Sequence, residues 1–174
     1  MSVATLPVIL EVPDARLKTR AEPVVTIDDT LRRTMDGMLE AMYEAPGIGL
    51  AGPQIGLMRR VVVVDTAGQD EPRRPIRLIN PEILWASSER AIAEEGCLSL
   101  PGYYGEVERA AAVRVGYTDE TGQAREIEGD GLLARCLQHE IDHLDGILFI
   151  DHLSALKRGM ILRKLAKARR AKRD

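Results

Sequence analysis

Apolar residues recur every three or four positions in three parts of the chain, which predicts three helices. The first is predicted over residues 28–45, where an Asp can cap the amino end and Pro46-Gly47 ends the helix. The second opens at Gly129-Asp130-Gly131 and runs through Leu144. The third begins near Ser154 and continues into the carboxyl-terminal tail.

Between the first two helices the apolar residues form short runs, and these runs predict strands at 59–65, 76–80, 82–86, 91–95, 110–118 and 124–128. Residues 1–27, broken by three prolines, are predicted to be irregular, and the Gly-rich residues 47–56 to form a loop. The order of helix, many strands, helix and helix predicts an α+β fold. We expect mostly antiparallel sheets packed around the second helix, followed by a carboxyl-terminal helix.

The composition indicates one folded domain with a charged tail. Hydrophobic residues make up 45% of the 174 residues and charged residues 29%, which suits a domain with its own core. Residues 157–174 hold nine Lys or Arg and one acidic residue, a net +8, so the rest carries −11 of the total −3. Such a tail can attract a polyanion, for which RNA is the obvious candidate.

The chain lacks the features of a secreted or membrane protein. Two cysteines, Cys97 and Cys136, are too few for a disulfide framework, and no apolar run approaches the ~20 residues of a membrane span. Residues 1–7 have neither the charged nor the apolar region of a signal peptide. We expect no membrane association and a bacterial-type cytoplasm, with an organelle form as the less favoured alternative.

The strongest chemical signal is His139-Glu140-Ile141-Asp142-His143, on the second predicted helix. Histidines four residues apart lie on one helical face, so both imidazoles can reach one metal ion. A Glu beside the first ligand can act as a general base in metal-assisted hydrolysis. The histidines fall beside the apolar stripe of this helix, which is formed by Leu133, Leu137, Ile141 and Leu144.

A catalytic metal usually has three protein ligands, and the candidates for the third are His152, Cys97 and Cys136. Cys136 precedes His143 by seven residues, or roughly 10 Å along a helix, so it is better interpreted as part of the site wall. Cys97 follows a predicted strand and a flexible Gly96, and a thiolate is a strong ligand for zinc or iron. Without the histidines, a buried inert thiol would be the preferred interpretation of Cys97.

Three motifs together resemble the peptide deformylase family. They occur in the order Gly47-Ile48-Gly49-Leu50-Ala51-Gly52-Pro53-Gln54, Glu95-Gly96-Cys97-Leu98-Ser99 and Gln138-His139-Glu140-Ile141-Asp142-His143. The resemblance covers nearly the whole chain. It implies a hydrolase that removes the formyl group from N-formylmethionine of nascent polypeptides, with release of formate. It also implies one divalent metal per chain, natively Fe(II), with Ni, Co or Zn possible in purified protein.

Residue roles carry over by motif, as implications of this resemblance. Cys97, His139 and His143 would bind the metal, and Glu140 would shuttle protons. Gln54 and the Leu98 amide would stabilise the oxyanion. The substrate-binding residues would be Ile48, Gly49, Gly102, Leu132 and Cys136. His139 would also help to shape the pocket for the methionine side chain, and Arg109 would pair with Glu95.

Two departures from the family pattern bear on these implications. Gly52 stands where many members have Ala, which we expect to loosen the first motif, and Tyr103-Tyr104 stands where many carry an Arg that helps to hold the peptide. Residues 1–153 would form the catalytic domain and residues 154–174 a basic helical tail. Some bacterial members use such an extension to contact the ribosome.

Three alternatives remain open from the sequence. A metallopeptidase that cuts internal bonds shares the His-Glu-x-x-His helix but usually lacks the Cys ligand. A non-enzymatic ribosome-binding or structural-metal protein would not need Glu140, which is present. A related enzyme could act on another formylated or acylated amine.

Overall fold

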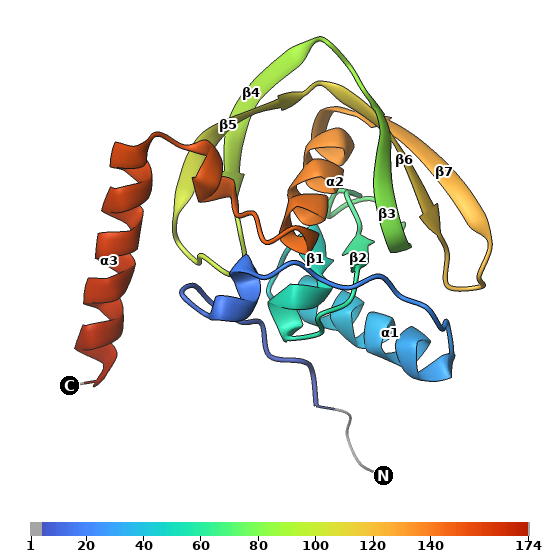
Figure 1. The fold of residues 1–174 in the computed structure, drawn as a ribbon, viewed down its shortest axis with the longest axis horizontal. Helices are drawn as coiled ribbons and strands as arrows, with labels where there is room; N and C mark the ends of the chain where they lie inside the picture. Colours follow the sequence, from blue (N-terminus) through green and yellow to red (C-terminus); the bar gives the residue numbers. More distant parts are fainter. Residues whose placement is uncertain (1–4, 174) are drawn as a thin grey trace.

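A single helix, α2 (Gly131–Leu144), occupies the middle of the fold (Figure 1). This computed structural model describes residues 5–173; the predictions that fall on residues 1–4 and on Asp174 lie outside the described residues. Gly131 has a φ of 52°, a conformation that favours glycine, and it lets the chain turn from the preceding strand into α2.

Five strands form one sheet in the order β1-β2-β3-β6-β7, with every neighbouring pair antiparallel. Their bounds are β1 (Gly49–Ala51), β2 (Val61–Val64), β3 (Ile76–Ala86), β6 (Ala112–Thr118) and β7 (Ala124–Asp130). A second antiparallel sheet contains β4 (Arg90–Gly96) and β5 (Tyr104–Ala110). The α+β class and the mostly antiparallel sheets around α2 are confirmed.

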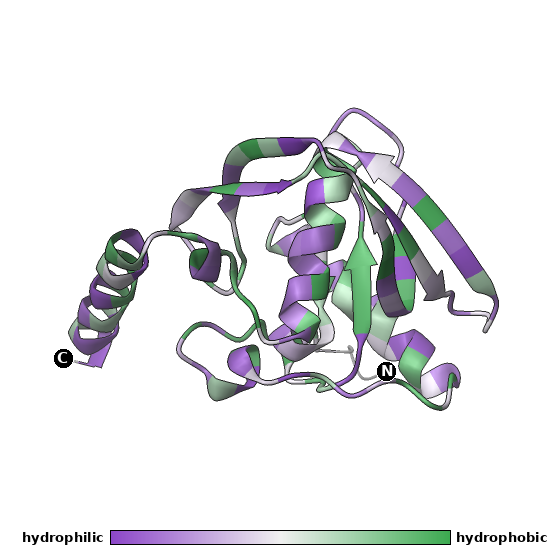
Figure 2. Cartoon of the chain, turned by 45° about the horizontal axis from the view of Figure 1, so that its top comes forward, coloured by the Kyte–Doolittle hydropathy of each residue, from purple (hydrophilic) through white to green (hydrophobic). Residues whose placement is uncertain are grey.

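Strand β2 is buried on both faces because helices cover both sides of the sheet there. Val62 and Val64 pack with the apolar stripe of α2, whereas Val61 and Val63 pack against α1 (Asp29–Glu44). Figure 2 shows β2 as a hydrophobic strand beside α2. The alternation of side chains along a strand explains how four consecutive valines serve two cores.

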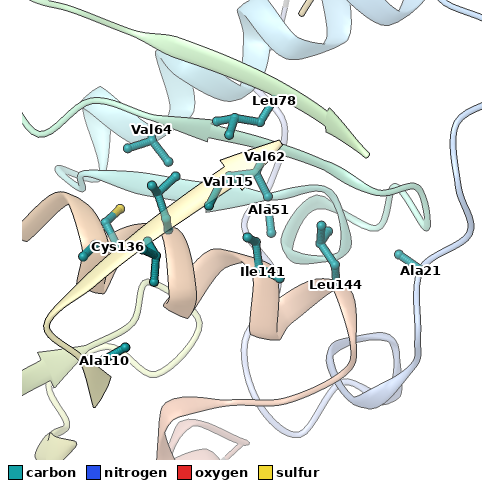
Figure 3. Packing of buried hydrophobic residues seen from close by; sticks show 13 residues of the cluster. Ala21, Ala51, Val62, Val64, Leu78, Ala110, Val115, Cys136, Ile141 and Leu144 are labelled. Carbon is teal, nitrogen blue, oxygen red and sulfur yellow. The ribbon is translucent and has the colours of Figure 1, made fainter. Parts of the chain in front are cut away.

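The stripe predicted on α2 faces the first of these cores, where Leu137, Ile141 and Leu144 are buried and Leu133 packs at the edge. Figure 3 shows Ile141 and Leu144 directed toward Val62 and Ala51 of the sheet. Burial of this face fixes the rotation of α2 about its own axis. The rotation in turn determines where the neighbouring positions His139, Glu140 and His143 point.

A third core joins the ends of the chain. Short 3₁₀ helices, η1 (Ala15–Lys18) and η3 (Phe149–His152), contribute Leu17, Phe149 and Ile150 to it. The final helix α3 (Ala155–Arg173) packs against this cluster through the partly buried Ile161, Leu162 and Leu165. Helix α3 has no fully buried residue and stands to one side of the sheets (Figure 1).

Several predicted boundaries are wrong. The two strands predicted at 76–80 and 82–86 are the single strand β3, which continues through Pro81 because its register shifts there and Asn80 adopts a φ of 51°. The strand predicted at 110–118 is β6, which begins two residues later, at Ala112, and the strand before it, β5, was not predicted. The loop predicted at 47–56 contains β1 and a 3₁₀ helix, η2 (Gly52–Ile55).

Candidate active site

Helix α2 presents three polar side chains that are almost completely buried, His139, Glu140 and His143. The Nε2 atoms of the two histidines are 3.3 Å apart. Cys97 follows β4 directly, and its Sγ lies 3.4 Å from His143 Nε2. One donor atom from each of Cys97, His139 and His143 lies within 4.8 Å of the others.

These separations fit a single metal ion. Bonds of about 2.05 Å to nitrogen and about 2.3 Å to sulfur, at tetrahedral angles, place two nitrogens about 3.3 Å apart and a nitrogen and a sulfur about 3.6 Å apart. The distances of 3.3 Å and 3.4 Å found here are close to both values. The three donors therefore suit a cation such as Zn²⁺ or Fe²⁺. His152 and Cys136 are not part of this group.

His139 is oriented by a buried carboxylate. Its Nδ1 donates to Glu95 Oε1 over 2.9 Å, which directs Nε2 toward Cys97 and His143. Arg109 donates to Glu95 through Nε and Nη2, at 2.6 Å and 2.9 Å, as the resemblance implied. Burial alone would raise the pKa of Glu95, but the hydrogen bonds from His139 and Arg109 outweigh it and hold this pKa below its usual range.

The two imidazoles differ in their affinity for a proton. Burial lowers the pKa of His139, but contacts with Cys97 and Glu95 outweigh this effect and raise the pKa to about 10. Burial and the neighbouring His139 hold the pKa of His143 well below its usual range. His139 is therefore the more basic of the two imidazoles.

Glu140 stands beside the three donors, with its Oε1 3.9 Å from His139 Nε2. Its Oε2 is buried and has no hydrogen-bond partner among residues 5–173. Burial raises the pKa of this carboxyl group to about 7, although His139 acts in the opposite direction. A carboxyl group that titrates near neutrality can both accept and donate a proton.

Gln54 points its amide into the same site. Its Oε1 accepts from the Ala51 backbone N–H at 2.9 Å, so the amide orientation is fixed. Its Nε2 donates to Ser99 Oγ at 3.1 Å and lies 3.6 Å from Cys97 Sγ. Ser99 belongs to the Cys97 motif, but the sequence reasoning gave it no role; its polar side chain in an otherwise apolar turn was the available signal.

A cleft of about 660 Å³ leads to these groups. All eleven residues predicted for the site lie at the cleft or directly behind it. Ten of them line it, namely Ile48, Gly49, Gln54, Cys97, Leu98, Gly102, Leu132, Cys136, His139 and Glu140. The eleventh, His143, lies behind Cys97 and is fully buried.

The first departure from the family pattern does not act as we expected. Gly52 is buried, and a Cβ added there would lie 2.6 Å from the Arg59 carbonyl oxygen and 2.7 Å from that of Leu57. The glycine therefore allows a close approach of two backbone segments, and it does not loosen the loop. At the second departure, the ring of Tyr104 lies against Gly96, where an added Cβ would be 2.6 Å from a ring carbon.

Arg135 is a further residue that the sequence reasoning missed. It comes from α2 and donates to Glu95 Oε2 at 2.6 Å and to the Val107 carbonyl oxygen at 2.9 Å. It thereby ties α2 to both strands of the β4–β5 sheet. Its one available signal was its position four residues before His139, on the side of α2 away from the apolar stripe.

A helix that places two histidines and a glutamate beside a cysteine thiol, at the foot of a cleft, has the arrangement of a metal-dependent hydrolase.

The comparisons with known proteins define the family. The family model for polypeptide deformylase matches residues 7–159. A peptide deformylase from Methylocella silvestris is 59% identical over 163 residues, which cover 92% of this chain and 83% of the relative. One from Rhizobium meliloti is 51% identical over 164 residues, 94% of each chain.

Solved structures agree with this result. A peptide deformylase from Ehrlichia chaffeensis superposes with a TM-score of 0.92 at 37% identity, over 98% of this chain and 100% of that one. One from Synechococcus elongatus in complex with actinonin superposes with a TM-score of 0.88 at 43% identity, over 95% of this chain and 91% of that one. The chain belongs to the polypeptide deformylase family, hydrolases that remove the N-formyl group from N-formylmethionine. None of the helices in the described part of the chain is long and apolar enough to cross a membrane.

Proposed function

We propose that this chain deformylates nascent polypeptides with Cys97, His139 and His143 holding one divalent metal ion and Glu140 moving protons. The observation that carries the proposal is the meeting of three metal donors within 4.8 Å, beside a buried carboxylate oxygen that has no hydrogen-bond partner among the described residues. A bound divalent cation supplies Lewis acidity to such a reaction. Fe(II) is the native metal that the family resemblance implies, and Ni, Co or Zn are ions that thiolate and imidazole donors also accept.

Each protein group then has a defined part in the reaction. Glu140 takes a proton from the attacking water and delivers it to the leaving amine, which yields formate and a free amino-terminal methionine. Gln54 Nε2 and the Leu98 amide donate to the formyl oxygen as negative charge develops on it. The fixed orientation of the Gln54 amide supports this role. Loss of one such donor typically costs about 10²–10³ in rate.

The cleft supports the predicted substrate contacts. Ile48 and Leu132 are apolar and exposed at its rim, and Cys136 lies deeper, beside Glu140. Together with His139 they form the pocket for the methionine side chain. Gly49 and Gly102 contact the peptide through their backbones, and Gly102 sits in a turn with a φ of 85°.

Formate release from a formyl-Met tripeptide tests the proposal. Protein purified without oxygen is loaded with iron or nickel and compared with Glu140→Ala at equal metal content. We expect a loss of about 10²–10⁴ in kcat, the usual contribution of a general acid–base group. Glu126→Ala, which changes an exposed carboxylate on β7, serves as the matched control. Wild-type activity in Glu140→Ala, or no formate release from loaded wild type, would contradict the assignment.

We propose further that residues 1–153 form the catalytic domain and that the basic tail 154–174 contacts ribosomal RNA in a bacterial-type cytoplasm. All nine Lys and Arg residues of α3 are exposed. Within the described residues, Arg158 alone among them has a carboxylate partner, Asp151. The other eight have no carboxylate partner among the described residues, although Arg169 Nη1 donates to the Val12 carbonyl oxygen, and they can contact phosphates.

The tail proposal is tested by sedimentation with ribosomes over a range of salt concentrations. A variant with Arg169→Gln, Arg170→Gln and Lys172→Gln should bind more weakly, and the dependence of its binding on salt should be shallower because fewer counterions are released. Its hydrolysis of a free tripeptide should match wild type. Binding that is equal in both proteins, or insensitive to salt, would refute the contact.

A further inference from the structure

A chain of hydrogen bonds leads from His139 to the protein surface. Beyond Glu95 it continues through Arg109, whose Nη1 donates to Asp142 Oδ2 over 2.9 Å. The same Asp142 oxygen lies 2.8 Å from Nε2 of His152. Four consecutive contacts of 2.6–2.9 Å therefore connect His152 with a predicted metal ligand.

The geometry of this chain transmits orientation. Arg109 has a rigid planar guanidinium group that engages Glu95 through two N–H groups and Asp142 through a third. Fixing the third contact fixes the plane of the guanidinium and thus of the carboxylate that orients His139. The side-chain exposure rises outward, from 4% at Glu95 and 5% at Arg109 to 21% at Asp142 and 36% at His152.

Asp142 depends on His152 because it is the least enclosed acceptor in the chain of contacts. Arg109 and His152 both donate to its Oδ2. Without His152 one donor remains, and water can reach the carboxylate from the exposed side. A carboxylate with a single partner has more rotational freedom than one held by two.

His152 itself is held in place by η3. Phe149 of the same 3₁₀ helix is buried, and its ring lies nearly parallel to that of His139, with 6.4 Å between centroids. Asp151, adjacent to His152, accepts from the Leu148 backbone N–H and forms an ion pair with Lys18 of η1. The position of His152 is thus set by contacts other than the one it makes with Asp142.

We propose that His152 is a positioning residue for the metal centre: by donating to Asp142 it holds Arg109 and Glu95, and through them the metal-binding ring of His139. The inference rests on the proposed assignment of Cys97, His139 and His143 as the metal ligands. It goes beyond that assignment because His152 touches neither the cleft nor the ligands.

Three variants separate positioning from general stability. His152→Leu removes the N–H donor and puts an apolar side chain in its place. His152→Gln retains an N–H group with a similar reach, so it should restore the contact. Lys18→Met removes one half-exposed ion pair of Asp151, which keeps its contacts with the Leu148 N–H and with Arg158. Phe149 also stays buried, so η3 and the contact between His152 and Asp142 should keep their places.

The measurements use cobalt-loaded protein. The rate of cobalt loss to a chelator reports how firmly the ligands are held, and the visible absorption reports their geometry. Changing a direct hydrogen-bond partner of a ligand typically costs 10–100-fold in affinity. Because His152 acts at a greater distance, we expect cobalt loss about threefold to tenfold faster in His152→Leu, with an altered cobalt spectrum. His152→Gln and Lys18→Met should resemble wild type in both measurements, and kcat of His152→Leu should fall without a change in KM.

Two results would overturn the inference. One is a rate of cobalt loss and a spectrum in His152→Leu that equal those of wild type. The other is a change of the same size in His152→Gln or in Lys18→Met, since the effect would then not depend on the donated hydrogen bond. Cys97→Ser tests the underlying assignment separately: if the thiolate-to-cobalt absorption is absent from wild type, or persists in Cys97→Ser, the ligand assignment itself fails.

Discussion

Replacing Gly49 with Ala should damage catalysis more than stability. A Cβ built at this position lies 2.8 Å from each of three atoms, namely Cys136 Sγ, Glu140 Cγ and Glu140 Oε1. Ordinary contacts of a Cβ begin near 3.4 Å, so these side chains or the β1 backbone must move by roughly 0.6 Å. Gly49 does not have a positive φ, so alanine adds no backbone strain and the clash is the whole perturbation.

The size of the effect on stability and on rate depends on which side chain moves. Overpacking a buried site typically costs about 1–3 kcal/mol, which corresponds to a Tm lower by about 2–12 °C for a chain of this length. Glu140 and Cys136 are both buried, so the displaced carboxylate has little free space. A reacting group misplaced by about 1 Å can cost about 100-fold in rate. We therefore expect kcat for formate release to fall by roughly that factor while the bound metal per chain is unchanged.

Gly37→Ala is the matched control. Gly37 lies within α1, and a Cβ there would meet only Pro7 Cδ, at 3.6 Å. Alanine in a helix interior is favoured over glycine by about 0.5–1 kcal/mol, so this variant should gain stability and keep full activity.

The double variant Gly49→Ala with Cys136→Ala removes the contact with sulfur. It should recover part of the Tm and leave the loss in kcat, since the contact with Glu140 remains. A Gly49→Ala enzyme with wild-type kcat would refute the reasoning, and so would a loss of activity that follows the loss of metal.

Three further predictions test the surroundings of the site. Arg109→Met leaves Glu95 buried without its bidentate partner and should lower the free energy of unfolding by about 3–5 kcal/mol in denaturant titrations. Arg125→Met breaks a pair that is exposed on the arginine side and should lower it by under about 1 kcal/mol. Equal losses would contradict the burial argument. Burial and a hydrogen bond to Asp65 raise the pKa of Tyr43 to about 12. The contribution of Tyr43 to stability is therefore present below pH 10 and is lost as pH rises through 12. An absorbance titration should show one phenolate that forms near pH 12 and is absent from Tyr43→Phe. A chelator should lower the Tm of wild type, because an ion at 1,000 times its Kd contributes about 4 kcal/mol to the free energy of unfolding, and it should leave the Tm of Cys97→Ala unchanged. An equal decrease in both proteins would argue against Cys97 as a ligand.

The sequence determines the α2 half of the site because that half is local. Two histidines and a glutamate within five residues share one helical face whatever the rest of the chain does. Cys97 is different, since 46 residues separate it from His143 and no spacing rule brings them together. The motif resemblance, not periodicity, assigned Cys97 to the metal and Gln54 to the oxyanion. The structure places all these residues at one cleft, and their roles remain predictions.

The errors in the fold prediction have physical causes. Pro81 indicated a break, but the register shift in β3 accommodates it. Strand β5 was missed because its exposed positions, Tyr104, Glu106 and Glu108, give it a polar pattern. Of its buried positions, Val107 joins the third core, but Arg109 is charged and pairs with the buried Glu95. Gly52 was assigned flexibility because a sequence gives no information on the carbonyl groups that approach it.

The charged network behind the metal site is better explained by position than by stability. Glu95 is held by Arg109, Arg135 and His139 in a buried setting, where removing charges from water costs much of what their attraction returns. Apolar side chains of similar volume would fill the same space at little or no loss of stability. They could not hold the His139 ring with its Nε2 toward Cys97, because an apolar side chain offers no acceptor to fix the proton on Nδ1. The fold obtains its stability from the two apolar cores on either side of β2, and the network serves to hold one imidazole in a single orientation.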